Sequence, residues 1–325
     1  MVNSVDFDPH QKGAAYIAAT RYKLGDYRPY LYKTKDYGKT WTQITDGIPS
    51  EHFTRVVRVD PKRAGLLYAG TEAGMYISFD DGASWKPFQL NLPIVPITDL
   101  TIKNDNLIAA TQGRSFWLID DITPLHQLND EVAASNAHLF KPLASYRMNG
   151  GQGGGYMPVP KDEGKNHPNG VMVYYYLKDT AKTTASLEIM EMNGKVIKKF
   201  ATKPDKKAKE EPLKIKPGMN LQLWNMRYPN AEGFDGLIMW GASLRGPKAV
   251  PGKYKAKLTV NGNAMETEFE ILKDPRTQGT IADIQEQFNF AIKVRDKLSD
   301  ANMAVKKIRD ARDQINRVIE PMKDK

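Results

Sequence analysis

The sequence contains no cysteine, and several other features that would point to a function are absent. Without cysteine there is no disulfide, no thiolate nucleophile and no cysteine-ligated zinc site in its 325 residues. The five histidines lack a metal-ligand spacing such as His-Glu-x-x-His, and no Gly-x-Ser-x-Gly elbow or phosphate-binding Walker sequence occurs. We therefore expect no metal ion and no cofactor.

Long apolar runs and concentrated charge are also absent. No run of about 18 apolar residues occurs, so no transmembrane segment is expected. The first residues have neither the basic nor the apolar region of an export signal, so the chain as given carries no signal peptide. The net charge is +9, but its basic residues are mixed with acids. This pattern is typical of a solvated surface, with an anionic partner as the alternative, and nucleic acid is not an expected partner.

One eight-residue motif occurs twice, 44 positions apart. Residues 34–41 (Thr-Lys-Asp-Tyr-Gly-Lys-Thr-Trp) and 78–85 (Ser-Phe-Asp-Asp-Gly-Ala-Ser-Trp) both follow [ST]-x-D-x-G-x-[ST]-W. Asp can accept hydrogen bonds from nearby backbone N–H groups, and Gly readily takes the positive φ of a tight turn. We expect each motif to form a structural hairpin turn whose Trp points inward. The defining residues are Thr34, Asp36, Gly38, Thr40, Trp41, Ser78, Asp80, Gly82, Ser84 and Trp85.

Strand-like alternation fills residues 1–128 and divides into three similar units, of which the third lacks the motif. A period of this length is typical of β-propeller blades. Known propellers need at least about four blades to close a ring. We therefore expect either that the chain is part of a longer protein with further blades upstream, or that several copies complete a ring.

The composition changes after the third unit. Residues 141–170 are rich in Gly and Pro and are predicted to be a linker. Six alternating segments follow and predict an immunoglobulin-like β-sandwich with Trp224 and Tyr254 in its core. Asn193-Gly194 and Asn261-Gly262 are predicted hairpin turns. The six segments are residues 171–177, 185–191, 196–200, 221–224, 252–260 and 266–271.

The last segment has a helical period. Thr280 and Asp283 form a capping box, and apolar residues then recur every three or four positions as far as Ile319. This pattern predicts one long amphipathic helix, or a hairpin of two helices joined near residues 299–300, with Pro321 ending it. The apolar stripe needs a partner, which is the sandwich, a sister chain or helices downstream.

Taken together, these segments resemble the sortilin-like Asp-box (BNR repeat) β-propeller proteins of Bacteroidetes and related bacteria, which are often labelled as glycosyl hydrolases. The most specific stretches are residues 25–30, 66–72, 91–93 and 113–117. Residues 224–229 and 251–254 look like signatures of a flagellar hook-capping type Ig-like domain. The resemblance implies a mainly β chain at the cell envelope or outside the cell. Its expected parts are propeller blades at 1–140, a linker at 141–170, an Ig-like sandwich at 171–274 and a helical tail at 275–325.

No catalytic set is recognised in the sequence. A glycosidase needs two carboxyl groups about 5 to 10 Å apart, and the carboxylates of the two motifs are expected to hold turns. Gln112 stands where the family usually has His, which argues against acid–base chemistry at that position.

Two candidate ligand surfaces remain. The first is Asp26, Tyr27, Arg28 and Tyr30 in a blade insertion. The second is Arg114, Phe116 and Trp117, for which the alternative is core packing around a buried Arg–Asp pair.

Three functions stay open at this stage. The first is a non-catalytic binding protein, in which propeller loops bind a protein or polysaccharide and the sandwich and helix act as spacer or docking element. The second is a fragment of a secreted glycoside hydrolase, sialidase- or xyloglucanase-like, with catalytic carboxylates partly upstream. The third is a module that oligomerises through its helix.

Overall fold

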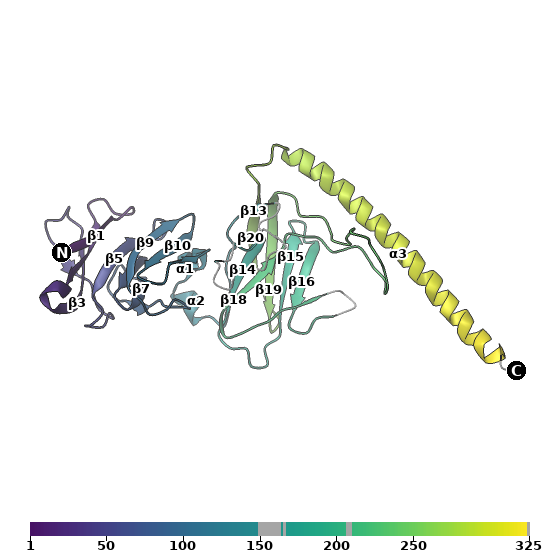
Figure 1. Cartoon of the computed structure of the whole chain (residues 1–325), viewed down its shortest axis with the longest axis horizontal. Helices are drawn as coiled ribbons and strands as arrows, with labels where there is room; N and C mark the ends of the chain where they lie inside the picture. Colours follow the sequence, from purple (N-terminus) through teal and green to yellow (C-terminus); the bar gives the residue numbers. More distant parts are fainter. Residues whose placement is uncertain (149–163, 165–166, 206–209, 324–325) are drawn as a thin grey trace. The chain divides into compact units, whose positions relative to one another are not determined.

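The computed structural model describes residues 1–148, 164, 167–205 and 210–323. They form two compact units, Met1–Leu128 and Asn129–Lys325. The chain is mainly β with several separate sheets and one long C-terminal helix, which confirms the predicted class (Figure 1). No helix among the described residues is long and apolar enough to cross a membrane.

The first unit consists of three antiparallel sheets in which strands that are neighbours in sequence are neighbours in space. The first sheet contains β1 (Val2–Phe7), β2 (Ala15–Arg21), β3 (Asp26–Thr34) and β4 (Thr42–Gln43). The second contains β5 (Thr54–Val59), β6 (Leu67–Thr71), β7 (Gly74–Ser78) and β8 (Lys86–Pro87). The third has only β9 (Ile97–Lys103), β10 (Asn106–Thr111) and β11 (Phe116–Ile119).

Two apolar cores hold these sheets together face to face. One contains Leu31 and Ile44 of the first sheet region with Tyr76 and Trp85 of the second. The other joins the second sheet to the third. All five residues of β6 and of β7 are buried, because the second sheet is covered on both faces. This explains why these two strands are apolar at nearly every position instead of alternating.

Two short helices that the sequence did not predict follow the third sheet. α1 (Thr123–Gln127) has Pro124 in its first turn, where the missing N–H is no loss. α2 (Asp130–Ala134) begins after Asn129, whose side chain accepts a hydrogen bond from the backbone N–H of Val132. Residues at both starts are therefore good helix-initiating types, but each helix is too short to give a periodic signal.

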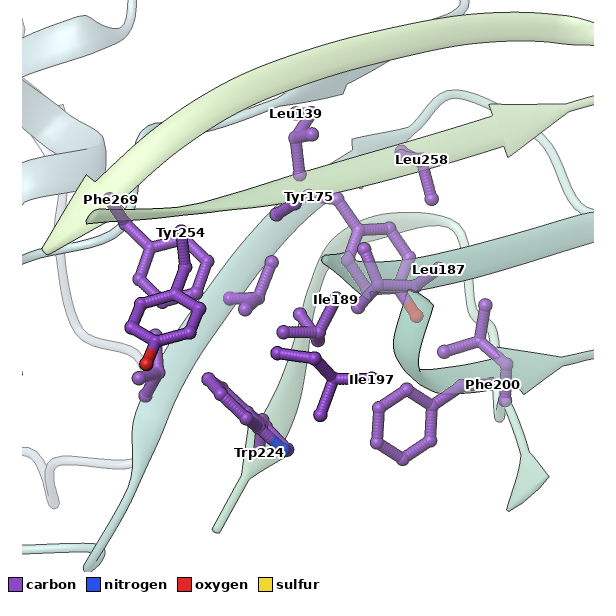
Figure 2. Packing of buried hydrophobic residues seen from close by; sticks show 14 of the residues in the cluster. Leu139, Tyr175, Leu187, Ile189, Ile197, Phe200, Trp224, Tyr254, Leu258 and Phe269 are labelled. Atoms are coloured by element: carbon purple, nitrogen blue, oxygen red, sulfur yellow. The ribbon is translucent and has the colours of Figure 1, made fainter. Parts of the chain in front are cut away.

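The second unit is a sandwich of two sheets. One has the order β12 (Ala137–Leu139), β14 (Val171–Leu177), β18 (Gly218–Trp224). The other has the order β13 (Ser145–Arg147), β20 (Asn263–Lys273), β19 (Gly252–Val260), β15 (Ala185–Glu191), β16 (Val196–Ala201), β17 (Glu211–Pro212). Figure 2 shows Tyr254 and Phe269 together at one end of the core between them and Phe200 at the other. Trp224 and Tyr254 are buried there, as expected.

The boundary between the units differs from the expected one at residue 140. β12 pairs with β14, so residues 137–139 belong to the sandwich. β13 lies in the predicted linker and pairs in parallel with β20. Both strands have three residues, too few for alternation to be recognised. Most of the Gly- and Pro-rich linker, residues 149–163 and 165–166, lies outside the described residues, as do residues 206–209.

α3 (Ile281–Lys323) is one continuous helix, so the helical-hairpin alternative is wrong. The capping box is present: the Thr280 N–H donates to Asp283 at 2.8 Å, and the Asp283 N–H donates to the Thr280 hydroxyl at 3.1 Å. The helix also continues past Pro321, which was expected to end it. A proline in the last turn removes a single backbone hydrogen bond, because few residues follow that could use one.

The sandwich covers the first part of α3. Ile284 is buried, and Phe288 and Ile292 pack against the sandwich core. Asn302 donates a hydrogen bond to the backbone carbonyl of Glu232. Further along, Ile308, Ile315, Val318 and Ile319 are exposed.

Candidate functional site

The two copies of the repeated motif form closed hydrogen-bond networks. Asp36 accepts from the Thr34 hydroxyl at 2.8 Å and from the N–H of Thr40 at 2.9 Å, and the N–H of Gly38 donates to the Thr34 hydroxyl. The donated bonds from Thr40 and Thr34 lower the pKa of Asp36 to about 2. The second motif repeats the same bonds among Ser78, Asp80, Gly82 and Ser84. Both carboxylates accept hydrogen bonds that define the turn.

The two motif tryptophans have different surroundings. Trp85 is only 3% exposed, and its indole Nε1 donates to the carbonyl of Ile44 on the first sheet. Trp41 is 41% exposed and donates to Gly38 in its own turn. The expectation that each Trp points inward is therefore wrong for Trp41. The first sheet gives Trp85 a surface to pack against, whereas no described residue offers Trp41 an equivalent surface.

Asp26 is the centre of a charged cluster at the start of β3. Arg28 donates to Asp26 through Nε and Nη2, both at 3.0 Å, and the Tyr30 hydroxyl donates at 2.5 Å. These bonds, from Arg28 first, hold the pKa of Asp26 well below its usual range. Arg21 forms a further ion pair with the same carboxylate at 3.5 Å. The guanidinium groups of Arg21 and Arg28 both lie within 6 Å of the centre of the Tyr30 ring.

An aromatic cluster extends this site toward the second sheet. Phe53 stacks with Tyr22 at 5.1 Å between ring centres and lies 6.1 Å from Tyr27. Arg55 lies over Phe53 and pairs with Glu72 at 2.5 Å. We call this set the arginine–aromatic surface, and it consists of Arg21, Tyr22, Asp26, Tyr27, Arg28, Tyr30, Phe53, Arg55 and Glu72.

The structure brings together the four residues of the first predicted surface and adds five that the sequence reasoning missed. The missed residues come from separate segments, the 3-10 helix Tyr22–Leu24, the start of β5 and the β6–β7 turn, among others. Only their arginine and aromatic types could have suggested them, because such residues are common in binding surfaces. Three arginines face two carboxylates, so the surface carries a net positive charge, and the guanidinium of Arg28 remains largely exposed.

The second predicted surface does not form. Phe116 is 76% exposed, whereas Trp117 packs against the core between the second and third sheets. The two residues are adjacent on a strand and point to opposite faces. Arg114 is exposed and donates to the carbonyl of Gly113. No ion pair of Arg114 is present among the described residues, so the alternative of a buried Arg–Asp pair is wrong too.

Buried Asp60 and half-buried Asp6 in the first unit also have structural roles. Asp60 is fully buried and accepts hydrogen bonds from the N–H groups of Lys62 and Arg63, from the Tyr68 hydroxyl and from His126. Burial alone would raise the pKa of Asp60, but these bonds lower it. Burial raises the pKa of Asp6, whose carboxylate accepts a bond from Val59 between two strands. No cluster of metal-ligating side chains occurs among the described residues.

Comparisons with known proteins give low similarity. No family model matches the chain, and no curated protein matches it. Among solved structures, an ancestral GH74 enzyme is 23% identical over 35% of this chain and 14% of its own, with a TM-score of 0.29. YCF48 bound to a D1 peptide is 21% identical over 37% of this chain and 36% of its own, with a TM-score of 0.28. A GH74 xyloglucanase from Xanthomonas campestris is 16% identical over 54% of this chain and 29% of its own, with a TM-score of 0.30.

The chain thus spans less than two fifths of the length of each of these proteins. Similarity at this level assigns no activity, and the function has to be argued from the residues of this chain.

Proposed function

We propose that this chain belongs to an Asp-box β-propeller protein that binds a ligand without catalysis. The three stacked antiparallel sheets and the two identical Asp-box turns support the propeller. The sandwich, proposed to be Ig-like, and α3 act as spacer or docking element. The proposed location, the cell envelope or the exterior, rests on the resemblance of the sequence motifs.

The observation that carries the binding function is the arginine–aromatic surface. Exposed Arg28 and Arg21 can each form bidentate hydrogen bonds with a carboxylate. Tyr27, which is also exposed, adds apolar contact area. Phe53 is buried under Tyr22, so few aromatic ring faces are open for stacking on a sugar. This favours an acidic segment of a protein partner over a polysaccharide.

The Asp26 carboxylate is better suited to positioning than to proton transfer. A general acid needs a raised pKa so that it holds a proton near neutral pH, and the pKa of Asp26 is lowered. In this site the carboxylate fixes Arg21, Arg28 and Tyr30 in place. Such preorganisation reduces the entropy that binding must overcome.

Titration with acidic peptides of differing length and charge tests the proposal. We expect Arg28→Ala to weaken binding about tenfold, equivalent to about 1.4 kcal/mol, because it removes a charged donor. Arg114→Ala is the matched control, since this arginine is also exposed in the first unit. Equal binding by Arg28→Ala and the parent chain would refute the proposed site. Turnover of a polysaccharide that is lost in Asp26→Asn would instead support the glycoside hydrolase alternative.

A further inference from the structure

The junction between the second and third sheets has an opening where the junction between the first and second sheets is closed. At the closed junction, Trp85 packs on the loop after β4. Its N–H donates to the carbonyl of Asp46 at 2.8 Å, and its indole donates to the carbonyl of Ile44 at 2.8 Å. The second sheet's own fourth strand, β8, follows directly.

The loop after β4, whose carbonyls accept the two bonds from Trp85, has an equivalent 44 residues later, after β8. The Ile44 N–H bonds to the carbonyl of Leu31, and the Phe88 N–H bonds in the same way to that of Met75. Asp46 therefore corresponds to Leu90. Neither the Phe88 carbonyl nor the Leu90 carbonyl accepts a hydrogen bond in the described first unit. The loop thus has the acceptors of the closed junction, but no donor reaches them.

The third sheet lacks the strand that would supply the donors. The backbones of the three sheets follow the same course up to one shared hydrogen bond. In this bond the N–H of Tyr37, Asp81 or Ile122 donates to the carbonyl of Gly13, Gly65 or Asp105, respectively, each at 2.9 Å. After that bond the first two sheets form an Asp-box turn, a Trp and a fourth strand, whereas the third enters α1. β11 consequently pairs only with β10 and is a sheet edge among the described residues.

An apolar cavity of about 40 Å³ lies at this position, between the loop and β10–β11. Its lining includes Phe88, Leu90, Ala109 and Trp117. Phe88 and Trp117 stand where the closed junction has Ile44 and Tyr76, and these bulkier side chains narrow the space. A cavity of roughly 150 Å³ holds benzene, so the remaining space suits an aliphatic side chain better than an indole.

Leu90 is an independent sign of a ligand. Its side chain is 70% exposed at the rim of the cavity, and its backbone has φ of +46°. A bulky apolar residue is uncommon in this left-handed region, where Asn and Asp are enriched. Leu90 is neither buried nor in a backbone conformation that leucine favours, so the described structure gives no reason for a leucine at this position. An apolar ligand contact would account for it.

We propose that the free edge of β11 and the adjacent cavity form a peptide-binding site, which takes an extended segment of a protein partner as the fourth strand of the third sheet. The backbone of the segment pairs with β11, and an aliphatic side chain enters the cavity. The backbone N–H of the residue whose side chain enters the cavity donates to the carbonyl of Leu90, as the Trp85 N–H does to Asp46 at the closed junction. The site is separate in its residues from the arginine–aromatic surface and does not depend on the function proposed for it.

A peptide with the sequence of residues 82–90 is the natural probe, since this segment performs the same role at the closed junction. We expect the Trp85→Leu version, labelled for fluorescence anisotropy, to bind the full chain. The Trp85→Asp version should bind at least about tenfold more weakly, because a carboxylate would enter an apolar cavity. A further version with Phe88→Pro in the peptide lacks a strand-pairing N–H and should also bind more weakly. Equal binding by all versions, or by none, would overturn the proposal.

Variants of the protein locate the site. Leu90→Asp should abolish binding of the Trp85→Leu peptide while the chain stays folded, since this position is exposed and Asp tolerates its backbone angles. Leu24→Asp is the matched control, because Leu24 is an equally exposed leucine (76%) elsewhere in the first unit. Ala109→Leu fills the cavity from inside and should also reduce binding. Unchanged binding by Leu90→Asp would place the peptide elsewhere and refute the inference.

Discussion

The tryptophans of the two repeated motifs, Trp41 and Trp85, provide a matched test of how much the contact between sheets contributes to stability. Trp85 and Trp41 occupy the same motif position, but Trp85 is 3% and Trp41 41% exposed. A buried Trp removes about 200 Å² from water, worth about 5 kcal/mol at about 25 cal/mol per Å² as an upper bound. The buried hydrogen bond to Ile44 adds about 1 kcal/mol.

Trp85→Ala should therefore lower the free energy of unfolding of the first unit by about 3 to 5 kcal/mol, the usual range for this substitution in a core. Trp41→Ala loses only the indole bond to Gly38 and keeps the other bonds of its turn. It should cost about 2 to 3 kcal/mol, in proportion to the smaller buried area of Trp41. Hydrogen exchange of β6 amides in the full chain reports the first unit alone. Equal acceleration by both substitutions would refute the reasoning, since it would mean that the sheet contact adds nothing to the turn.

Three further outcomes follow from local geometry. Gly82→Ala should destabilise the first unit by about 1 to 3 kcal/mol more than Gly38→Ala. The two glycines have the same backbone angle, with φ of +83° and +84°, but only at Gly82 would an added Cβ lie 2.6 Å from Ile44. Equal losses of unfolding free energy in denaturant would contradict this. The pKa of Asp36 is lowered from 3.8 to about 2, so its stabilising contribution is complete above about pH 4 and is lost toward pH 2, and carboxyl NMR titration should give a midpoint near 2 rather than near 3.8. Thr280→Ala should speed hydrogen exchange in the first turn of α3 by removing a cap worth about 1 kcal/mol, and unchanged exchange would mean that the capping box is not formed in solution.

Local chemistry made much of the fold predictable. The turn at Asn261-Gly262 has φ of +49° and +87°, as its residue types indicate. β14, β15 and β19 have the predicted bounds because their alternation has an apolar residue at each buried position. The capping box at Thr280 likewise depends on residues three positions apart.

Features that depend on distant contacts were not predictable in this way. β12 and β13 are strands only because β14 and β20 lie beside them. The exposure of Trp41 depends on what covers the first sheet, which the motif does not encode. The arginine–aromatic surface combines Asp26 with Phe53, and nothing in the spacing of these residues signals that they meet. Phe116 and Trp117 were grouped as neighbours in sequence, although strand geometry separates their side chains.

The double burial of the second sheet sets an order of events during unfolding. In a stack of similar units, stability is approximately a sum of terms for each unit and for each contact between neighbours. The second sheet has two such contacts, whereas in the described unit the first and third have one each. Partial opening should therefore begin at the outer sheets, and the amides of β6 and β7 should exchange only when the whole unit opens. The segment between the two repeated motifs is therefore the part of the first unit that should open last.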